Sequence, residues 1–585
     1  MLKNNKTLFA WGYALLCPII TFYLLECYTH NPFTTMKGPI QVLNIVFFEL
    51  VAALLFVCFQ QLRIALMAET SFFLIIGLAN FFVIQFRSAP IMPWDLLSLG
   101  TAVTVADNYS YRLDKNTIFV LLGFLLLLLF ESRCRYRMQK NWKIRLMKAS
   151  VLLLLLWGYV IMLHQDSTVR KFQLYDKLFT PTVMTKRDGT AVAFLMQLEY
   201  MSVSKPDGYN SKEAAALLDS YKTSQTVTKT PNIIVIMDEA LSDPGILGEI
   251  SVNEDYLPYI HSLMESGENT TSGNLNVSIL GGNTPNTEFE FLTGNTMAFL
   301  PQGSIPFQQY IKKELPSMAS HLRDIGYDTV AMHPYHAGGW DRDTVYPLLG
   351  FNRSYFLDDF TDATLVRNYV SDQSSFDKII DIYEKKEKKQ PLFIFNVTMQ
   401  NHSSYEDAFD NFKPAITVEG VESQLLSNYL SLMKLTDDAF RNLVQYFEKQ
   451  EEDTIIVLFG DHQPTNSVVE PVWRLQGKQG SNLTDTEEAL RYQVPYMIWS
   501  NFDTKEVTAR DTSANYLGGA VLETAGLPLP AYFNFLQEES SKFPILSAIQ
   551  AVTTDGTTTP VKEQADALNQ YSKLQYYQLF GTRKK

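Results

Sequence analysis

The chain has 585 residues, of which 46% are hydrophobic and 19% are charged, and its formal net charge at pH 7 is -13. This length is too great for one ordinary domain, and the aliphatic residues are concentrated near the N-terminus, so we expect a membrane part followed by a soluble part. The negative balance disfavours a nucleic-acid-binding protein.

Apolar stretches near the N-terminus approach the length of a transmembrane helix. There are about five of them, namely Leu8–Leu25, Ile40–Phe59, Ile64–Phe86, Thr117–Phe130 and Met147–Leu163. The first lacks a small-residue cleavage site, so we expect an anchor and not a removed signal peptide. Glu69 interrupts the third stretch, and the fourth is short. Glu49, within the second, is an acid that lipid disfavours, and both a function and a pairing with a neighbouring helix stay open for it.

Basic residues indicate how these spans are oriented. Lys3 and Lys6 precede the first span, and Arg63 follows the second. A basic cluster between the fourth and fifth spans contains Arg133, Arg135, Arg137, Lys140, Lys143, Arg145 and Lys148. Because cytoplasmic loops are rich in lysine and arginine, an odd number of spans predicts that everything after Leu163 lies outside the cell. Nucleic-acid binding is the weaker alternative for the cluster, which lies between apolar spans and has no nucleic-acid fold motif.

The remainder of the chain divides into a linker and a soluble domain. Residues 164–230 have a mixed composition with a helical pattern at Ser211–Tyr221, and we interpret them as a linker between the membrane part, 1–163, and a domain of residues 231–585. All four cysteines, Cys17, Cys27, Cys58 and Cys134, precede the linker, so the soluble domain must be held without disulfides.

Short aliphatic runs alternate with helical patterns after residue 231. The candidate strands are Ile233–Met237, Thr329–Met332, Leu392–Val397, Thr454–Phe459 and Tyr496–Trp499. The candidate helices include Met318–Ile325, Asp372–Lys385 and Ser423–Lys449. This alternation predicts an α/β domain with a mainly parallel central sheet, whose ligands collect beyond the carboxyl ends of the strands.

Three distant segments carry side chains suited to metal-assisted nucleophilic chemistry. Gly281-Gly282-Asn283-Thr284 places a threonine in a glycine-led turn, Glu239 ends an apolar run, and Asp461-His462 follows another. A threonine hydroxyl is a poor nucleophile unless a base or a metal lowers its pKa. Two carboxylates and a neutral imidazole suit Mn²⁺, Mg²⁺ or Zn²⁺ without selecting one of them. Taken singly, each segment could instead be an ordinary turn or helix cap.

The ordered set resembles the lipoteichoic acid synthases and phosphoglycerol transferases, a membrane-anchored branch of the alkaline phosphatase/sulfatase superfamily. The residues that carry the resemblance are Ile233, Met237-Asp238-Glu239, Gly282-Asn283-Thr284, Glu288-Phe289, His333, Trp340-Asp341-Arg342-Asp343, Asn401-His402, Gly460-Asp461-His462 and Ser513–Gly518. With the membrane spans, the resemblance covers most of the chain. It implies a bacterial, multi-pass membrane protein with an extracellular sulfatase-like catalytic domain.

The resemblance also implies roles for individual residues. Thr284 would be the nucleophile, and Glu239, Thr284, Asp461 and His462 would hold one divalent metal ion, Mn²⁺ or Mg²⁺. His333, Trp340, Arg342 and His402 would contact the phosphoglycerol group, and His402 could also transfer protons. The histidines could instead be structural, Trp340 could belong to the core, and Arg342 could pair with Asp341 or Asp343.

Two positions depart from the family pattern. Tyr335 stands where an acid is expected, which puts recognition of glycerol or of the acceptor in doubt, and Pro285 follows the nucleophile where a polar residue is expected. The turn around Thr284 looks closer to glucan-modifying phosphoglycerol transferases. The cleavage motif that releases the catalytic domain of lipoteichoic acid synthases is not clear here.

The expected function is transfer of phosphoglycerol from phosphatidylglycerol to a glycerol-phosphate polymer or a glycan, through a covalent intermediate on Thr284. A phosphoethanolamine transferase is the alternative, although the cysteines usual in that group are missing. A hydrolytic sulfatase would need a Cys/Ser-x-Pro-x-Arg motif, which the segment after Thr284 does not supply. A transporter or scaffold would leave the metal set unexplained.

Overall fold

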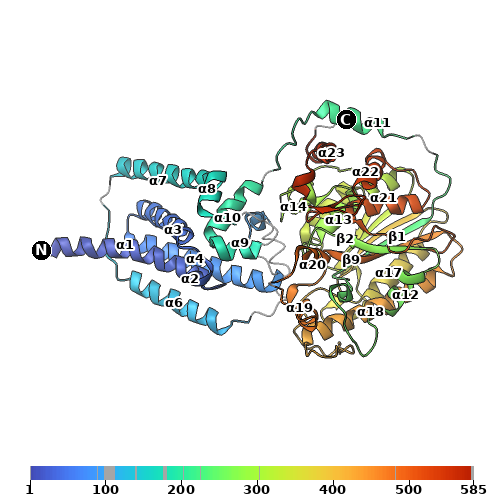
Figure 1. Ribbon diagram of the computed structural model, residues 1–585, viewed down its shortest axis with the longest axis horizontal. Helices are drawn as coiled ribbons and strands as arrows, with labels where there is room; N and C mark the ends of the chain where they lie inside the picture. The colour runs from blue at the N-terminus through green and yellow to red at the C-terminus, as the bar shows by residue number, and fades with distance from the viewer. Residues whose placement is uncertain are drawn as a thin grey trace. The chain divides into compact units, whose positions relative to one another are not determined.

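The computed structural model describes residues 2–87, 90–97, 112–138, 141–175, 181–201, 203–223, 226–301, 303–480 and 482–581. They form two compact units, an N-terminal and a C-terminal unit, with the division after residue 202 (Figure 1). This division lies within the predicted linker. The boundaries at residues 163 and 230 stay a prediction.

The N-terminal unit is built of helices, with no named strand in the part that the structure describes. Its long helices are α1 (Leu2–Glu26), α3 (Gly38–Phe59), α4 (Leu62–Arg87), α6 (Lys115–Glu131) and α7 (Trp142–Leu163). Shorter helices are α2 (Pro32–Thr35), α8 (Asp166–Phe172), α9 (Pro181–Asp188) and α10 (Thr190–Gln197). These helices occupy the stretches where the apolar spans were predicted.

Four of the long helices are long and apolar enough to cross a bilayer, against about five expected. The four segments are Phe9–Glu26, Gly38–Phe59, Leu62–Gln85 and Trp142–Leu163. The remaining one, α6, has 17 residues. Large apolar side chains project outward, such as Leu154 and Trp157 of α7, which are 64% and 65% exposed. Water disfavours such a surface, so these helices indicate a membrane protein. The buried Oε1 of Glu49 has no hydrogen-bond partner among the described residues, so a pairing of that oxygen with a neighbouring helix is not seen.

The C-terminal unit contains a mainly parallel central sheet, as predicted. Its strands are β1 (Asn232–Asp238), β2 (Thr270–Asn276), β3 (Asp328–Met332), β4 (Arg353–Tyr355), β7 (Leu392–Val397), β8 (Thr454–Gly460), β9 (Gln493–Ser500) and β10 (Thr512–Ser513), in the order β10-β2-β9-β8-β1-β7-β3-β4. Strands β8, β1, β7, β3 and β4 are mutually parallel, whereas β9 runs antiparallel to both β8 and β2. All five strands predicted from the sequence occur.

Two small sheets and thirteen further helices surround this sheet in the described part of the unit. The small sheets are β11 (Ile545–Leu546), β12 (Ala551–Val552) and β13 (Thr558–Thr559), and β5 (Leu365–Val366) with β6 (Tyr369–Val370). The helices are α11 (Ser211–Ser220), α12 (Pro258–Ser266), α13 (Pro285–Thr293), α14 (Pro306–Gln309), α15 (Met318–Asp324), α16 (Arg342–Leu349), α17 (Asp372–Lys385), α18 (Gln424–Phe447), α19 (Asn466–Leu475), α20 (Asp485–Leu490), α21 (Ala514–Thr524), α22 (Ala531–Lys542) and α23 (Asn569–Phe580).

Helices cover both faces of the central sheet (Figure 1). Along β1, Ile233 and Val235 belong to the core under α13, α21 and α22, whereas Ile234 and Ile236 belong to the core against α17 and α18. Alternate side chains of a strand point to opposite faces, and a sheet buried on both faces must be apolar throughout. That requirement explains why β1 and β8 read as continuous aliphatic runs. The polar residues of β1 and β8 lie at the ends of these strands.

Candidate functional site

The candidate site lies at the carboxyl ends of neighbouring parallel strands. Glu239 follows β1, and Asp461 and His462 follow β8, the strand beside it. His402 lies in the loop after β7, and His333 follows β3. Ligands of open α/β sheets bind at this edge. Tertiary structure thus gathers residues that are up to 223 positions apart, from Glu239 to His462.

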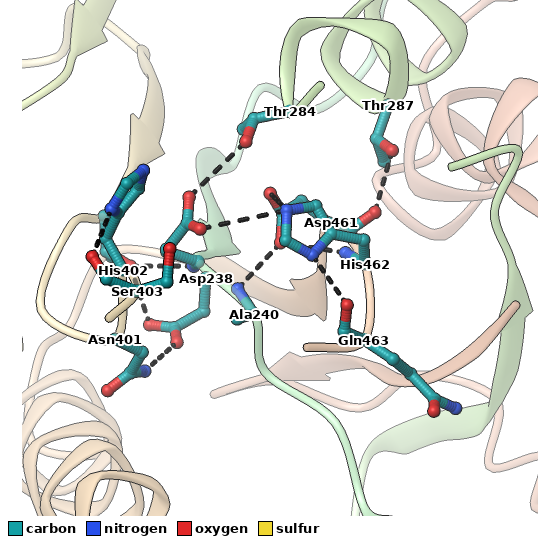
Figure 2. A network of polar contacts seen from close by, with 12 residues as sticks. Asp238, Ala240, Thr284, Thr287, Asn401, His402, Ser403, Asp461, His462 and Gln463 are labelled. Carbon is teal, nitrogen blue, oxygen red and sulfur yellow. Dashed lines mark hydrogen bonds and ion pairs between the residues drawn. The ribbon is translucent and has the colours of Figure 1, made fainter. Parts of the chain in front are cut away.

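Thr284 occupies the cap position of α13, but its hydroxyl does not cap the helix. The N–H groups of Asn286 and Thr287 donate instead to the carbonyl oxygens of Asn283 and Thr284, at 2.9 and 3.1 Å. The hydroxyl turns toward Glu239 and lies 3.4 Å from its Oε2 (Figure 2). Pro285 fits the first helical position, where a missing N–H costs nothing. The local turn therefore leaves the hydroxyl available for chemistry.

Glu239, Asp461 and His462 form a compact group of potential metal ligands. One ligand atom from each lies within 4.8 Å of the others, and all three residues are buried. His462 Nε2 is 3.2 Å from Asp461 Oδ2 and 3.8 Å from Glu239 Oε1. Figure 2 shows Thr284 facing this group from α13. The predicted ligand set is thus brought together around one point.

The hydrogen bonds around this group leave one ligand atom of Asp461 and one of His462 without a partner. The Nδ1 of His462 lies 2.9 Å from the carbonyl oxygen of Gln463, which can only accept, so Nδ1 carries the proton. Asp461 Oδ1 accepts from the backbone N–H groups of Ala240 and His462, each at 2.8 Å. His462 Nε2 and Asp461 Oδ2 remain buried with no hydrogen-bond partner among the described residues. Buried polar atoms are rarely left so, and a bound cation would satisfy both.

The electrostatics also fit a cation. Burial, and then the charge of Asp461, raise the pKa of Glu239 well above its usual value. Two carboxylates held together away from water repel one another, and a divalent ion between them would remove that penalty. Glu239, Asp461, His462 and the Thr284 hydroxyl therefore fit the predicted divalent metal ion.

A glycine lets the two ligand segments approach closely. A Cβ atom added to Gly460 would lie 1.9 Å from the carbonyl oxygen of Leu241. Real Cβ atoms do not come so near to an oxygen, so the segment after β1 can pass the end of β8 only at a glycine. Gly460 thus determines how closely Asp461 can approach Glu239.

Arg342 is buried beside α13 and is held by Glu288. Its Nε and Nη2 atoms donate to Glu288 Oε1 at 3.0 and 2.5 Å, and Tyr346 donates to Glu288 Oε2 at 2.7 Å. Its Nη1 lies 3.0 Å from Nε2 of His333, whose Nδ1 lies 3.0 Å from the carbonyl oxygen of Val397. Burial and the charge of Arg342 lower the pKa of His333 well below its usual value, so the ring is neutral. Arg342 was expected to contact the phosphoglycerol group or, as the alternative, to pair with Asp341 or Asp343. Its ion pair is with Glu288, which lies one helical turn after Thr284 and engages Nε and Nη2.

His402 is fixed by a loop that Arg367 holds in place. The imidazole Nδ1 lies 2.9 Å from the carbonyl oxygen of Ser403 and 3.1 Å from the Tyr369 hydroxyl. Arg367 donates to the carbonyl oxygens of Ser404, Gln400 and His402 at 2.7, 2.6 and 2.8 Å. Burial lowers the pKa of His402 to about 4, so the ring is neutral at pH 7. Figure 2 shows His402 and Asp461 on loops of different strands.

Trp340 and Tyr335 form the remaining part of the predicted substrate region. Trp340 and Asp341 have positive backbone φ values of 58° and 59°. Non-glycine residues adopt this conformation at a cost, and such strain is concentrated at functional sites. Tyr335, where an acid was expected, is buried with Tyr369 and Met399 in a small apolar cluster.

Some residues that organise the site gave no sequence signal. The Thr398 hydroxyl accepts from the Glu239 N–H at 3.0 Å and donates to Asp238 Oδ2 at 3.1 Å. Arg367 and Tyr369, which hold the His402 loop, belong to no recognisable motif. Asn401, which donates to Asp238 Oδ1 at 2.9 Å, was included in the resemblance but had no assigned role.

Comparison with known proteins identifies the family. The family model described as Sulfatase matches residues 231–527, more than half of the 585-residue chain. The chain belongs to the sulfatase family. A putative cyclic beta-1,2-glucan modification protein of Rhizobium meliloti (strain 1021) is 30% identical to this sulfatase-family protein over 456 residues, which are 75% of this chain and 69% of that protein. A lipoteichoic acid synthase of Staphylococcus aureus (strain USA300) is 24% identical over 242 residues, 40% of this chain and 36% of that protein.

Solved structures share the fold of this sulfatase-family chain. The phosphoglycerol transferase GacH of Streptococcus pyogenes, in complex with sn-glycerol-1-phosphate, has 21% sequence identity and a TM-score of 0.53, and the match covers 65% of this chain and 96% of that chain. The integral membrane lipooligosaccharide phosphoethanolamine transferase EptA of Neisseria meningitidis has 12% identity and a TM-score of 0.50, with coverage of 88% and 95%. The resemblance predicted from the sequence is confirmed at the level of the family and the fold.

Proposed function

We propose that this sulfatase-family protein is a membrane-anchored phosphoglycerol transferase with Thr284 as its nucleophile. It moves phosphoglycerol from phosphatidylglycerol to an acceptor in the cell envelope, a glycan or a glycerol-phosphate polymer. The observation that carries the proposal is the Thr284 hydroxyl, which is released from helix capping and lies 3.4 Å from Glu239 Oε2, beside two buried ligand atoms. The similarity to a glucan modification protein supports a glycan acceptor.

The reaction has two substitutions at phosphorus. In the first, Thr284 Oγ bonds to the phosphorus of the donor lipid as it loses its proton, and the bond to the diacylglycerol oxygen breaks, with that oxygen taking up a proton. In the second, an acceptor hydroxyl displaces Thr284 from the phosphorus, and the threonine recovers its proton. A divalent ion held by Glu239, Asp461, His462 and Thr284, Mn²⁺ or Mg²⁺, would lower the pKa of the hydroxyl and offset phosphate charge.

Other groups of the chain also have parts in this proposal. The neutral His402 imidazole, with its lowered pKa of about 4, can orient the glycerol or the acceptor hydroxyl through a hydrogen bond. Arg342 provides a fixed positive charge beside α13 for the developing phosphate charge, while Glu288 and His333 hold its guanidinium in place. Trp340 completes the predicted substrate contacts.

Phosphoethanolamine transfer is the second candidate. The likeness to EptA extends over 88% of this chain and so includes most of its N-terminal helices. The same threonine and metal ligands would serve that reaction, with a different head group.

The decisive experiment identifies the group that becomes attached to Thr284. Purified full-length protein is incubated with Mn²⁺ and either glycerol-labelled phosphatidylglycerol or ethanolamine-labelled phosphatidylethanolamine, and the Thr284 peptide is analysed by mass spectrometry. We expect a phosphoglycerol adduct that is absent from Thr284→Ala and present in Thr508→Ala, a matched change at an exposed threonine. A phosphoethanolamine adduct would favour the second candidate, and undiminished transfer by Thr284→Ala would refute the nucleophile.

A further inference from the structure

A cavity of about 720 Å³ lies within the N-terminal unit, at one end of three of its long helices. It is formed by the segment after α1, the end of α4, the start of α6, and α9. Its lining includes Tyr28, His30, Phe81, Gln85, Asn116 and Lys186. The volume lies within the range of ordinary ligand sites. None of the proposed catalytic residues belongs to it.

The position of the cavity along the helices places it at the surface of the hydrocarbon layer. The apolar segments of α1 and α4 end at Glu26 and Gln85, and α6 begins at Lys115. These three points belong to the same end of the helices, since residues next to each of them line the one cavity. In the orientation predicted from the basic residues, this end faces the exterior. A molecule in the cavity would therefore be at the depth of lipid head groups in the outer leaflet.

The lining of the cavity combines an unpartnered imidazole nitrogen with a positive charge. The His30 side chain is only 3% exposed, and its Nε2 has no hydrogen-bond partner among the described residues. Glu26 is an acid close to it, with Oε2 3.6 Å from this nitrogen. Glu26 already accepts hydrogen bonds from the N–H and hydroxyl of Thr190, at 2.8 and 3.1 Å. His30 is thus not needed to satisfy Glu26.

Lys186 supplies the charge. It is exposed on α9 and lines the same cavity as His30. Burial, and then the charge of Lys186, lower the pKa of the His30 ring to about 4. The Thr29 hydroxyl lies 3.0 Å from Nδ1 and can donate to it, in which case the neutral ring carries its proton on Nε2 and can donate one hydrogen bond. The ammonium of Lys186 provides a cation. The carboxylate of Asp114, also in the lining, already accepts from the N–H of Thr117 at 2.6 Å as the cap of α6. Tyr28 and Phe81 give the cavity an apolar wall.

We infer that this cavity binds the head group of an acidic glycerophospholipid, with the phosphate at Lys186 and His30 and the apolar part of the lipid against Tyr28 and Phe81. A phosphate diester needs a cation and a hydrogen-bond donor side by side, and its glycerol backbone and acyl chains need an apolar wall at membrane depth. The inference does not rest on the transferase reaction, because it uses residues of the N-terminal unit alone.

The test measures lipid binding by full-length protein that carries Thr284→Ala, so that turnover cannot consume the lipid. Native mass spectrometry is used to compare the dissociation constants of dioctanoyl phosphatidylglycerol and dioctanoyl phosphatidylcholine. We expect Lys186→Gln to weaken phosphatidylglycerol binding about tenfold and His30→Gln to weaken it less. Lys186→Arg should retain binding, which separates loss of the charge from misfolding. Lys171→Gln, at an exposed lysine of α8 in the same unit, is the matched control and should bind as tightly as the parent.

Competition experiments distinguish a lipid phosphate from a soluble phosphate. Inorganic phosphate and sn-glycerol 1-phosphate should displace the lipid only weakly, because neither fills the apolar wall. Displacement by either at the concentration of the lipid itself would overturn the lipid assignment in favour of a soluble phosphate. Equal binding of phosphatidylcholine, or equal affinities in Lys186→Gln and Lys171→Gln, would overturn the site. Because binding is read without turnover, its failure is distinguishable from failure of the proposed reaction.

Discussion

Glu288, on α13, forms a buried ion pair with the guanidinium of Arg342. Arg342 and Glu288 are 2% and 0% exposed, so neither charge is solvated by water. Glu288→Gln keeps the shape of the side chain but leaves the guanidinium charge uncompensated. Removing one partner of a buried ion pair typically costs about 3–5 kcal/mol of stability. We expect Glu288→Gln to lower the free energy of unfolding by an amount of that size.

Thermal unfolding of the purified full-length protein measures this cost. Glu314→Gln, the same chemical change at an exposed position, is the matched control and should leave the unfolding midpoint unchanged. If the two variants unfolded at the same temperature, Arg342 would have to be balanced by a group other than Glu288.

Deprotonation of His261 makes the C-terminal unit less stable at alkaline pH. Its Nδ1 is 3.0 Å from Asp255 Oδ2 and its Nε2 is 3.6 Å from Asp243 Oδ2. The interaction with Asp243 is the main cause that raises the pKa of His261 to about 9. A raised pKa means that the folded state binds the proton more tightly than the unfolded state. The stabilisation is therefore complete below about pH 6.5, the unfolded value, and is lost as the pH rises through 9.

We expect the free energy of unfolding to fall by about 1 kcal/mol between pH 6 and pH 10, because partial exposure of His261 and its acidic partners weakens the interaction. The difference in unfolding midpoint between the parent protein and His261→Gln should narrow over this range. His321, whose pKa is lowered by burial, provides the control. The variant His321→Gln should lose the same stability between pH 6 and pH 10 as the parent protein. A constant difference between the parent and His261→Gln at all pH values would contradict the assignment.

The sequence predicted the proposed ligand residues but not the residues that support them. Glu239, Asp461 and His462 could be predicted because each ends or follows a buried aliphatic strand, and strand ends meet at one edge of a parallel sheet. Arg342 was expected to pair, if at all, with a neighbour in sequence, whereas its partner Glu288 is 54 positions away. Contacts of this kind depend on how helices pack, and no local pattern encodes them. Arg367 was missed for the same reason.

At the scale of elements, the end of β8 and the segment after β1 pack closely together at Gly460. Gly460→Ala would place a Cβ 1.9 Å from the Leu241 carbonyl oxygen, so the two segments must separate. We expect a destabilisation of about 1–3 kcal/mol and an affinity for Mn²⁺ reduced about tenfold or more, because the ligands move with their segments.

Isothermal titration with Mn²⁺ and thermal unfolding together check this prediction. Gly519→Ala is the matched control, since a Cβ there meets nothing closer than an ordinary contact at 3.8 Å. Gly519→Ala should bind Mn²⁺ like the parent. Unchanged affinity in Gly460→Ala would mean that the ligand group does not depend on this close approach.

The elements themselves were predictable where their sequence was apolar. Strands β1, β7 and β8 read as aliphatic runs because both of their faces are covered. Strand β2 has the sequence TTSGNLN and is buried at six of its seven positions, yet its composition is that of a loop. Its burial comes from pairing with β9 and from α12, which no local pattern reveals. Strand β9 was predicted, but its antiparallel direction depends on the connections and could not be read from its residues.

At the scale of the whole molecule, α6 decides on which side of the membrane the C-terminal unit lies. Its 17 residues are about 25 Å long, slightly less than the hydrocarbon thickness of about 30 Å. However, Phe119, Leu126 and Leu129 are 71%, 66% and 63% exposed, as expected for a helix in contact with lipid. If α6 crosses, the number of spans is odd and the cytoplasmic N-terminus predicts an exterior catalytic site. If it does not, a cytoplasmic N-terminus would place the site in the cytoplasm and would leave the basic cluster before α7 outside, against the positive-inside rule.

Cysteine labelling distinguishes these alternatives, because all four native cysteines lie in the N-terminal unit and can be replaced without altering the C-terminal unit. In a cysteine-free background, we expect Ser541→Cys, at an exposed position of α22, to react with a membrane-impermeant maleimide in intact cells. Ser132→Cys, in the basic connection after α6, should react only after the membrane is permeabilised. Reaction of Ser132→Cys in intact cells, with Ser541→Cys protected, would place the catalytic residues on the cytoplasmic side. A donor in the outer leaflet would then be excluded, since Thr284 could not reach its phosphorus.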